Sequence, residues 1–450
     1  MKDLLNQAAA RAGRYLEHLA ERSVAPTPQA IEGLEDFNEP LPEKPSDPQT
    51  VLAMLDEIGS PASMAVAGPR FYGFVIGGSL PAALAANWLA GAWDQNAGLY
   101  LSSPVAGKLE EVALGWLLDL LGLPPECGAG FVTGATMANF TALAAARHAV
   151  LEKAGWDVEA NGLFGAPPVT VIVGEEAHPT LFKSLGMLGL GRNRVVKVPV
   201  DEQGRMRVEA LPAINGPTIV CVQAGNVNTG AFDPIAQICE KAHSRGAWVH
   251  VDGAFGMWAV VAPARAHLAR GLEQADSWAT DAHKWLNVPY DSGLAFCRDR
   301  QALRAAMSIT AAYLPDGERR EPSNFTPELS RRARGVEIWA ALRSLGREGL
   351  ADLIELNCQH ASRFAEGLAA AGYEVLNKVE LNQVVVKFGD AETTRRVIRG
   401  IQEEGTCWAG VTEWQGHTAM RISVSSWATT GADVERSLEA MLKVAAGLKA

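Results

Sequence analysis

The 450-residue sequence lacks features that mark several classes of protein. Its six cysteines are far apart and form no C-x-x-C pair or Cys/His cluster, so neither a disulfide framework nor a metal site is expected. Its apolar runs, near 81–93 and 112–123, contain polar residues or fall short of the ~18 residues that a membrane-spanning helix needs. The N-terminus shows helical periodicity with acidic residues instead of the apolar core of a signal peptide. We therefore expect a cytoplasmic protein without a membrane partner.

Positive charge is also scarce. The chain has 40 Lys and Arg against 51 Asp and Glu, a formal net charge of -11, which argues against a nucleic-acid partner. Hydrophobic residues make up 48% of the sequence, enough for a large core, and at about 150 residues per domain the length suggests two to three domains. The expected partner is a small molecule.

Three segments of the chain differ in pattern. Residues 1–50 combine an amphipathic helix with a proline-rich arm, 51–310 alternate β-rich and helical runs, and 311–450 hold long helices followed by short strands. Near-continuous apolar strands separated by helices predict a largely parallel sheet covered on both faces. The fold class is therefore α/β, with a large domain at 51–310 and a small α+β domain at 311–450. The strands expected in the large domain are 169–173, 195–200, 218–223, 248–251, 276–280 and 293–297, and those in the small domain are 380–388 and 419–424. The expected helices include 263–270, 332–348 and 350–371.

The run GFVTGATMAN places Gly134, Ala135 and Thr136 at the entry to a helix. Unpaired backbone N–H groups and the positive end of the helix dipole can bind an anion at such a point. Threonine is also a common helix cap, so an ordinary cap is the alternative.

Three further polar positions follow predicted strands: His178, Asp252 and the pair His283–Lys284. A carboxylate opposite a heteroaromatic nitrogen keeps that nitrogen protonated, and a lysine beside an aromatic residue is a competent amine nucleophile. The plain alternatives are a helix-capping or packing histidine, a turn-forming aspartate and a solvated lysine. Because ligands bind at the carboxyl ends of parallel strands, one shared pocket that includes Thr136 explains these positions better than unrelated roles.

These residues belong to a longer pattern that resembles the group II pyridoxal-phosphate-dependent decarboxylases, the family of aromatic-amino-acid, glutamate and diaminobutyrate decarboxylases. The matching runs, in chain order over roughly 68–427, include PRFYGFV, TGATMAN, EEAHPTLFKSLGMLGLG, VHVDGAFG, DSWATDAHKWLNVPYDSG and RISVSSW. The resemblance implies a fold type I enzyme, an obligate homodimer with a shared active site, and pyridoxal 5'-phosphate as cofactor.

The resemblance also implies roles for single residues. Lys284 matches the Schiff-base lysine, Asp252 the partner of the pyridine nitrogen, and His178 the histidine that stacks on the cofactor ring. The other implied cofactor contacts are Gly134, Ala135, Thr136, Thr229, Ala254, Asp281 and His283. Arg421 matches the arginine that binds the substrate carboxylate in several fold type I enzymes. The aromatic residues Phe71 and Tyr72 are candidate substrate contacts, with core or dimer packing as the alternative.

The implied activity is decarboxylation of an L-amino acid to an amine and carbon dioxide, through an aldimine at Lys284. One departure concerns 313–331, which has no tyrosine after Tyr313, where many of these decarboxylases use a loop tyrosine to protonate Cα. His178 or Lys284 is then the candidate proton donor. The alternatives are another reaction on the same cofactor (a carbon–carbon lyase or aldolase, an aminotransferase or an aldehyde synthase) and a non-catalytic scaffold, which would need neither Lys284 nor Asp252.

Overall fold

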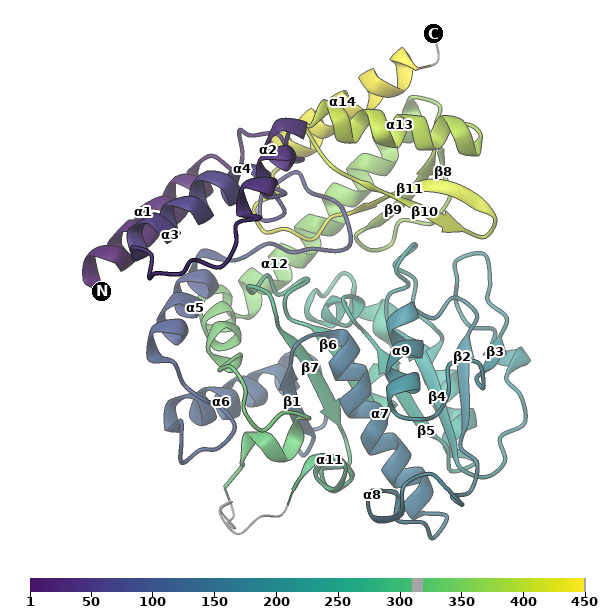
Figure 1. Ribbon diagram of the computed structural model, residues 1–450. Coiled ribbons are helices and arrows are strands. Elements are labelled where there is room, and N and C mark those ends of the chain that lie inside the picture. The colour runs from purple at the N-terminus through teal and green to yellow at the C-terminus, as the bar shows by residue number, and fades with distance from the viewer. Residues whose placement is uncertain (310–318, 449–450) are drawn as a thin grey trace. The chain divides into compact units, whose positions relative to one another are not determined.

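The computed structural model describes residues 1–309 and 319–448 and divides the chain into two compact units (Figure 1). Unit 1 comprises Met1–Ile76, Arg363–Leu376 and Val384–Ala450, and unit 2 comprises Gly77–Ser362 and Asn377–Gln383. This division differs from the sequence-based segments 1–50, 51–310 and 311–450, because both ends of the chain contribute to unit 1.

Unit 2 contains a seven-stranded sheet in the order β1-β7-β6-β5-β4-β2-β3. The five strands from β6 to β3 pair in parallel, whereas β7 runs antiparallel to both β1 and β6. The largely parallel sheet of the prediction is thereby confirmed. The strands are β1 (Gly128–Val132), β2 (Thr170–Gly174), β3 (Val196–Val198), β4 (Thr218–Gln223), β5 (Trp248–Asp252), β6 (Ser277–Asp281) and β7 (Gly293–Cys297).

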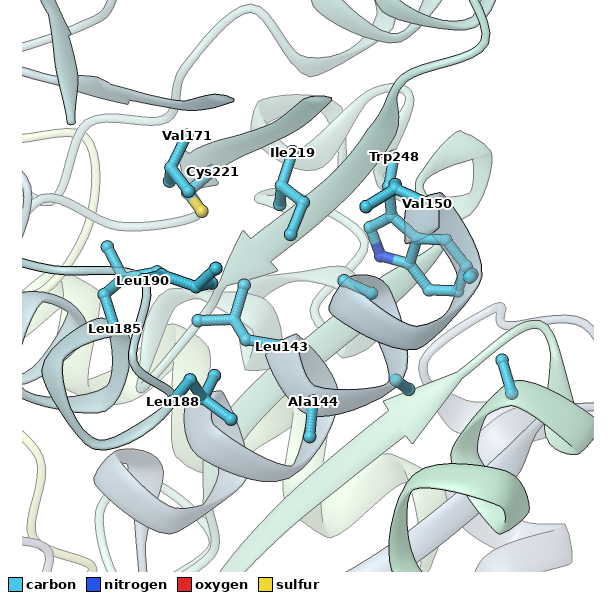
Figure 2. Close-up of a cluster of buried hydrophobic side chains, with 14 of the residues drawn as sticks. Leu143, Ala144, Val150, Val171, Leu185, Leu188, Leu190, Ile219, Cys221 and Trp248 are labelled. Carbon is cyan, nitrogen blue, oxygen red and sulfur yellow. The ribbon is translucent and has the colours of Figure 1, made fainter. Parts of the chain in front are cut away.

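Helix α7 covers one face of this sheet. Small alanines along α7, many of them fully buried, allow the helix to approach the strands closely. Figure 2 shows Leu143 of α7 near Ile219 and Cys221 of β4, and Val150 near Trp248 of β5. The α-helices that lie wholly within the described part of unit 2 are α5 (Pro81–Trp93), α6 (Pro104–Leu120), α7 (Ala135–Glu152), α8 (Val158–Asn161), α9 (Pro179–Met187), α10 (Ile235–His243) and α11 (Arg300–Met307).

Two expected helical regions differ in detail. The segment 263–270 contains only the 3-10 turn η5 (Ala266–Ala269) instead of an α-helix. The two helices expected at 332–348 and 350–371 form α12 (Gly335–Ala370), which is interrupted at Gly346, where φ is 63°. Glycine adopts this left-handed conformation without a steric penalty, so the break occurs there.

Unit 1 contains a four-stranded sheet in the order β10-β11-β9-β8. The guanidinium of Arg70, 3% exposed, binds Asp433 at 3.0 Å and donates to the carbonyls of Ala20 and Thr406. These contacts join the two ends of the chain in one unit. Its elements are α1 (Lys2–Glu17), α2 (Pro28–Glu32), α3 (Pro48–Met54), α4 (Ser60–Ala62), α13 (Ala391–Glu404), α14 (Gly431–Gly447), β8 (Glu374–Val375), β9 (Gln383–Lys387), β10 (Gly410–Trp414) and β11 (His417–Ser423).

Within 1–309 and 319–448, no helix combines the length and the apolar character needed to span a bilayer.

Candidate active site

Several of the expected site residues lie at one edge of the unit 2 sheet, where its parallel strands end. Asp252 is the last residue of β5 and Asp281 the last residue of β6. Gly134 precedes the first turn of α7, which follows β1. Since β7 is antiparallel to both β1 and β6, the carboxyl ends of β1 and β6 meet at this edge.

The carboxylate of Asp281 is the centre of the site. It accepts a hydrogen bond from the backbone N–H of Ala135 at 2.5 Å and contacts Lys284 Nζ at 2.9 Å. His283 Nε2 lies 3.4 Å from the same carboxylate. Three groups that sequence analysis assigned separately to the cofactor therefore converge on one buried acid, which is itself one of the predicted residues.

The ring of His283 has a fixed orientation. The backbone N–H of Ser292 donates to Nδ1 at 3.0 Å, so Nδ1 is an acceptor and Nε2 carries the proton toward Asp281. Tyr290 stacks on this ring with 4.2 Å between centroids. Burial lowers the pKa of His283, and the charge of Asp281 partly opposes that shift. The His283 ring is therefore neutral and held in place, and it can donate one hydrogen bond through Nε2–H.

Asp252 is buried beside the same groups. Burial raises the pKa of this carboxyl, while the charges of His178 and Lys284 and a hydrogen bond from Asn139 oppose the rise. The Ala254 N–H also donates to Asp252, at 3.3 Å. The charge of Asp281 adds to the rise, whereas these other neighbours favour the charged form of the carboxyl.

His178 caps the N-terminus of α9. Its Nδ1 accepts the Thr180 N–H at 3.4 Å and lies 2.7 Å from the Thr180 hydroxyl. The capping alternative is therefore observed, and the same side chain is close enough to Asp252 to influence its pKa.

The anion site at the start of α7 is tightly built from glycine. A Cβ on Gly293 would lie 2.5 Å from the Cα of Gly134, and a Cβ on Gly134 would lie 3.1 Å from the ring of His283. Within the part of the chain that the structure describes, the buried Ser292 Oγ has no hydrogen-bond partner. First-turn N–H groups that include Thr136, a histidine N–H, a spare hydroxyl and a lysine suit a phosphorylated group with an aldehyde, and Asp252 suits its ring nitrogen.

For the other predicted residues, the structure shows their local contacts. The hydroxyl of Thr229 donates to the carbonyl of Gln203 and accepts the Ala231 N–H, so its side chain serves the loop that contains it. Phe71 and Tyr72 belong to unit 1, where both side chains are buried. Arg421 lies in β11 of the same unit.

Tyr72 packs against Phe364 and hydrogen-bonds Ser437, which is the packing alternative considered for it. Phe71 is stacked on Trp408 at 5.1 Å between centroids. Tyr313 lies outside the described residues.

Sequence reasoning missed Ser292 and Tyr290, which orient His283. Both lie in the run NVPYDSG directly after the lysine, so nearness in sequence was the available signal. It also missed Asn139, whose amide reaches Asp252 from the second turn of α7 at 3.2 Å. Helical spacing from Thr136 would have placed it near the same strand ends.

Comparisons with known proteins agree on one group. The model for the pyridoxal-dependent decarboxylase conserved domain matches residues 32–389. Aromatic-L-amino-acid decarboxylase of Bacillus atrophaeus is 26% identical over 470 residues, covering 99% of this chain and 95% of that relative. L-2,4-diaminobutyrate decarboxylase of Rhizobium meliloti is 31% identical, with 94% and 87% covered.

Among solved structures, Oryza sativa TDC with PLP and tryptamine matches with a TM-score of 0.91 at 22% identity. The match covers 99% of this chain and 97% of that one, and it shows a common fold.

Proposed function

The chain belongs to the pyridoxal-dependent decarboxylase family, and from this premise we propose that it decarboxylates an L-amino acid on pyridoxal phosphate held at Lys284. When bound, this cofactor supplies an electron sink for the bond that breaks as carbon dioxide leaves. The observation that carries the assignment is the position of Lys284. Its Nζ lies 2.9 Å from buried Asp281, and its charge opposes the rise that burial causes in the pKa of Asp252.

The residues of unit 2 divide the binding task. The first turn of α7, with Gly134, Ala135 and Thr136, and the ring of His283 would hold the phosphate. Asp252 would hold the proton of the pyridine nitrogen, with Ala254 beside it. Asp281 keeps Lys284 and His283 turned into the site, and Thr229 shapes the neighbouring loop.

His178 is the proposed stacking residue and proton donor at Cα. Thr180 holds the ring through Nδ1, which lies 2.7 Å from its hydroxyl oxygen, and this leaves Nε2 as the nitrogen that delivers the proton. Lys284 is the alternative candidate for donating the proton to Cα. A donor of this kind replaces the loop tyrosine that the sequence lacks after Tyr313.

We also propose Arg421 as the ligand of the substrate carboxylate. Burial lowers the pKa of its guanidinium to about 10, with no other cause opposing the shift. Arg421 is partly buried, and such a cation gains from a carboxylate partner, because the pairing offsets its lost hydration. Phe71 and Tyr72 stay proposed contacts of the amino-acid side chain.

Assembly and location complete the proposal. Helix α5 is almost entirely apolar, yet only Ala83 is buried and Trp88, Leu89 and Trp93 are exposed. A helix apolar on every face normally lies inside a protein or interface, which supports a homodimer. Six buried, unbridged cysteines support a reducing compartment such as the cytoplasm.

The central test is covalent mapping. After borohydride reduction of the holoenzyme, peptide analysis should find the pyridoxyl group on Lys284, and Lys284→Ala should carry none. Lys241→Ala, which removes an exposed lysine on α10, is the matched control. Label on another lysine would contradict the assignment.

The reaction is tested by product balance. Each amino acid that is turned over should give equal amounts of carbon dioxide and amine. Turnover without carbon dioxide would favour the lyase or aminotransferase alternative, and aldehyde with ammonia would favour an aldehyde synthase.

A further inference from the structure

A row of buried polar side chains lies behind Asp252, inside unit 2. Along β5, Trp248, His250 and Asp252 alternate with two valines, so their side chains share one face of the sheet. Helix α7 covers that face, as the position of Trp248 beside Val150 in Figure 2 shows. The exposed fractions are 5% for Trp248, 0% for His250 and 6% for Asp252. Polar groups this deep require partners.

The partners form a continuous chain. Asn139 Nδ2 on α7 donates to Asp252 Oδ2 at 3.2 Å, and Asn139 Oδ1 lies 2.8 Å from His250 Nε2. The other ring nitrogen, His250 Nδ1, lies 2.9 Å from Ser277 Oγ on β6. Trp248 Nε1 donates to this hydroxyl oxygen at 2.8 Å. Asn139 and Ser277 are both fully buried.

The two ends fix the direction of every hydrogen bond between them. A carboxylate is only an acceptor, so the Asn139 amide N–H donates to Asp252 and Asn139 Oδ1 faces His250. An amide oxygen only accepts, so the neutral His250 ring carries its proton on Nε2 and donates to Asn139 Oδ1. His250 Nδ1 is then an acceptor, so the Ser277 O–H donates to it while Ser277 Oγ accepts from the Trp248 indole. Every donor points toward Asp252.

We propose that Asn139, His250 and Ser277 are positioning residues that hold the Asp252 carboxylate ionised and aimed at the cofactor's ring nitrogen. The inference rests on the proposed function, because it deepens the role given there to Asp252.

The physical reason is that hydrogen bonds to the charged form of an acid oppose the effect of burial on its pKa. Donors that all point one way polarise one another in a low-dielectric interior, which strengthens the last bond of the row. Burial also lowers the pKa of His250 to about 3, so this imidazole stays neutral and adds no second charge beside the ring.

The direction of the row is tested first in the wild-type holoenzyme and apoprotein. Nitrogen-15 NMR of histidine-labelled protein should show His250 as a neutral Nε2–H tautomer near neutral pH. The signal is assigned by its loss in His250→Gln. A protonated His250, or the Nδ1–H tautomer, would overturn the proposal.

The effect on Asp252 is tested by the nitrogen-15 shift of bound, ring-labelled pyridoxal phosphate, which reports protonation independently of turnover. Asn139→Leu should move the shift toward the neutral pyridine and lower kcat about tenfold or more, with a smaller change in KM. His250→Phe and Ser277→Ala should follow with decreasing effect. His250→Gln, which keeps a donor, should recover part of the loss.

The control is Thr141→Val on the same helix. Its buried hydroxyl donates to the Met137 carbonyl and takes no part in the row, so the ring-nitrogen shift should stay at the wild-type value.

The outcomes separate the two claims. A neutral ring nitrogen in the wild type would refute the role of Asp252 in the proposed function. A protonated wild-type nitrogen that stays unchanged in Asn139→Leu and Ser277→Ala would overturn the positioning row alone. Ser277→Ala removes a single oxygen, so the test stands even where the larger changes prevent folding.

Discussion

At the scale of single residues, the charge of Asp252 is the feature on which the proposed chemistry depends most. Asn in its place keeps the shape but loses the charge, so Asp252→Asn should retain cofactor while kcat falls about 10²–10³-fold, as for other losses of charge stabilisation in a dry site. Asp299→Asn, which preserves the N-cap of α11, is the matched control. Near-normal kcat in cofactor-saturated Asp252→Asn would contradict the assignment.

His250 gives a prediction about stability and pH. Burial lowers its pKa from 6.5 to about 3, so between these values the unfolded chain binds a proton that the folded chain excludes. The stability that comes from keeping His250 neutral is fully present above about pH 6.5 and is lost as pH falls toward 3. Over this range the free energy of unfolding decreases by up to about 1.4 kcal/mol per pH unit. Urea unfolding of wild type and His250→Gln from pH 7 to pH 4, at equal cofactor concentration, should show a shallower slope for the variant. Equal slopes would mean that His250 is protonated in the folded state.

At the scale of elements, β7 closely approaches the start of α7, where the phosphate is proposed to bind. A Cβ on Gly293 would meet the backbone of Gly134, so Gly293→Ala should displace the first turn of α7 and raise the Kd for pyridoxal phosphate about tenfold or more. Gly115→Ala in α6 meets no atom within 4 Å and should leave this Kd unchanged while stabilising its helix by about 0.5–1 kcal/mol. Fluorescence titration of the apoprotein measures both constants.

The elements also show how far the sequence could be interpreted. Apolar runs predicted β2, β4, β5, β6 and β7 to within about one residue, because a short continuous apolar run is typical of a strand buried on both faces. Strand β1 was missed, since GAGFV has two glycines and only three apolar side chains. Strand β10 was missed because its residues alternate between exposed and buried positions beside a turn. The ends of predicted strands indicated Asp252 and Lys284 as candidates. His250 was not identified, because it lies within an apolar strand and its partners come from α7 and β6, which are distant in sequence.

At the scale of the whole molecule, the exposed face of α5 predicts assembly. Light scattering of the holoenzyme should give twice the mass of one chain, and Leu89→Asp should shift the population toward the monomer, because it places a charge in an apolar interface. Phe164→Asp, at a side chain 98% exposed outside α5, should leave the mass unchanged. A fully active wild-type monomer would contradict the shared active site.

Because unit 1 is built from segments far apart in the sequence, it cannot fold until the later segments have been translated. Residues 1–76 are translated before residues 363–450, yet Phe71 stacks on Trp408 and Arg70 pairs with Asp433. Unit 2 is nearly complete once Ser362 has emerged, so it is expected to fold while the first segment still waits for its partners. Until Trp408 and Asp433 have been made, the N-terminal segment of the nascent chain therefore lacks its packing partners, and chaperones and proteases can reach its amphipathic helix.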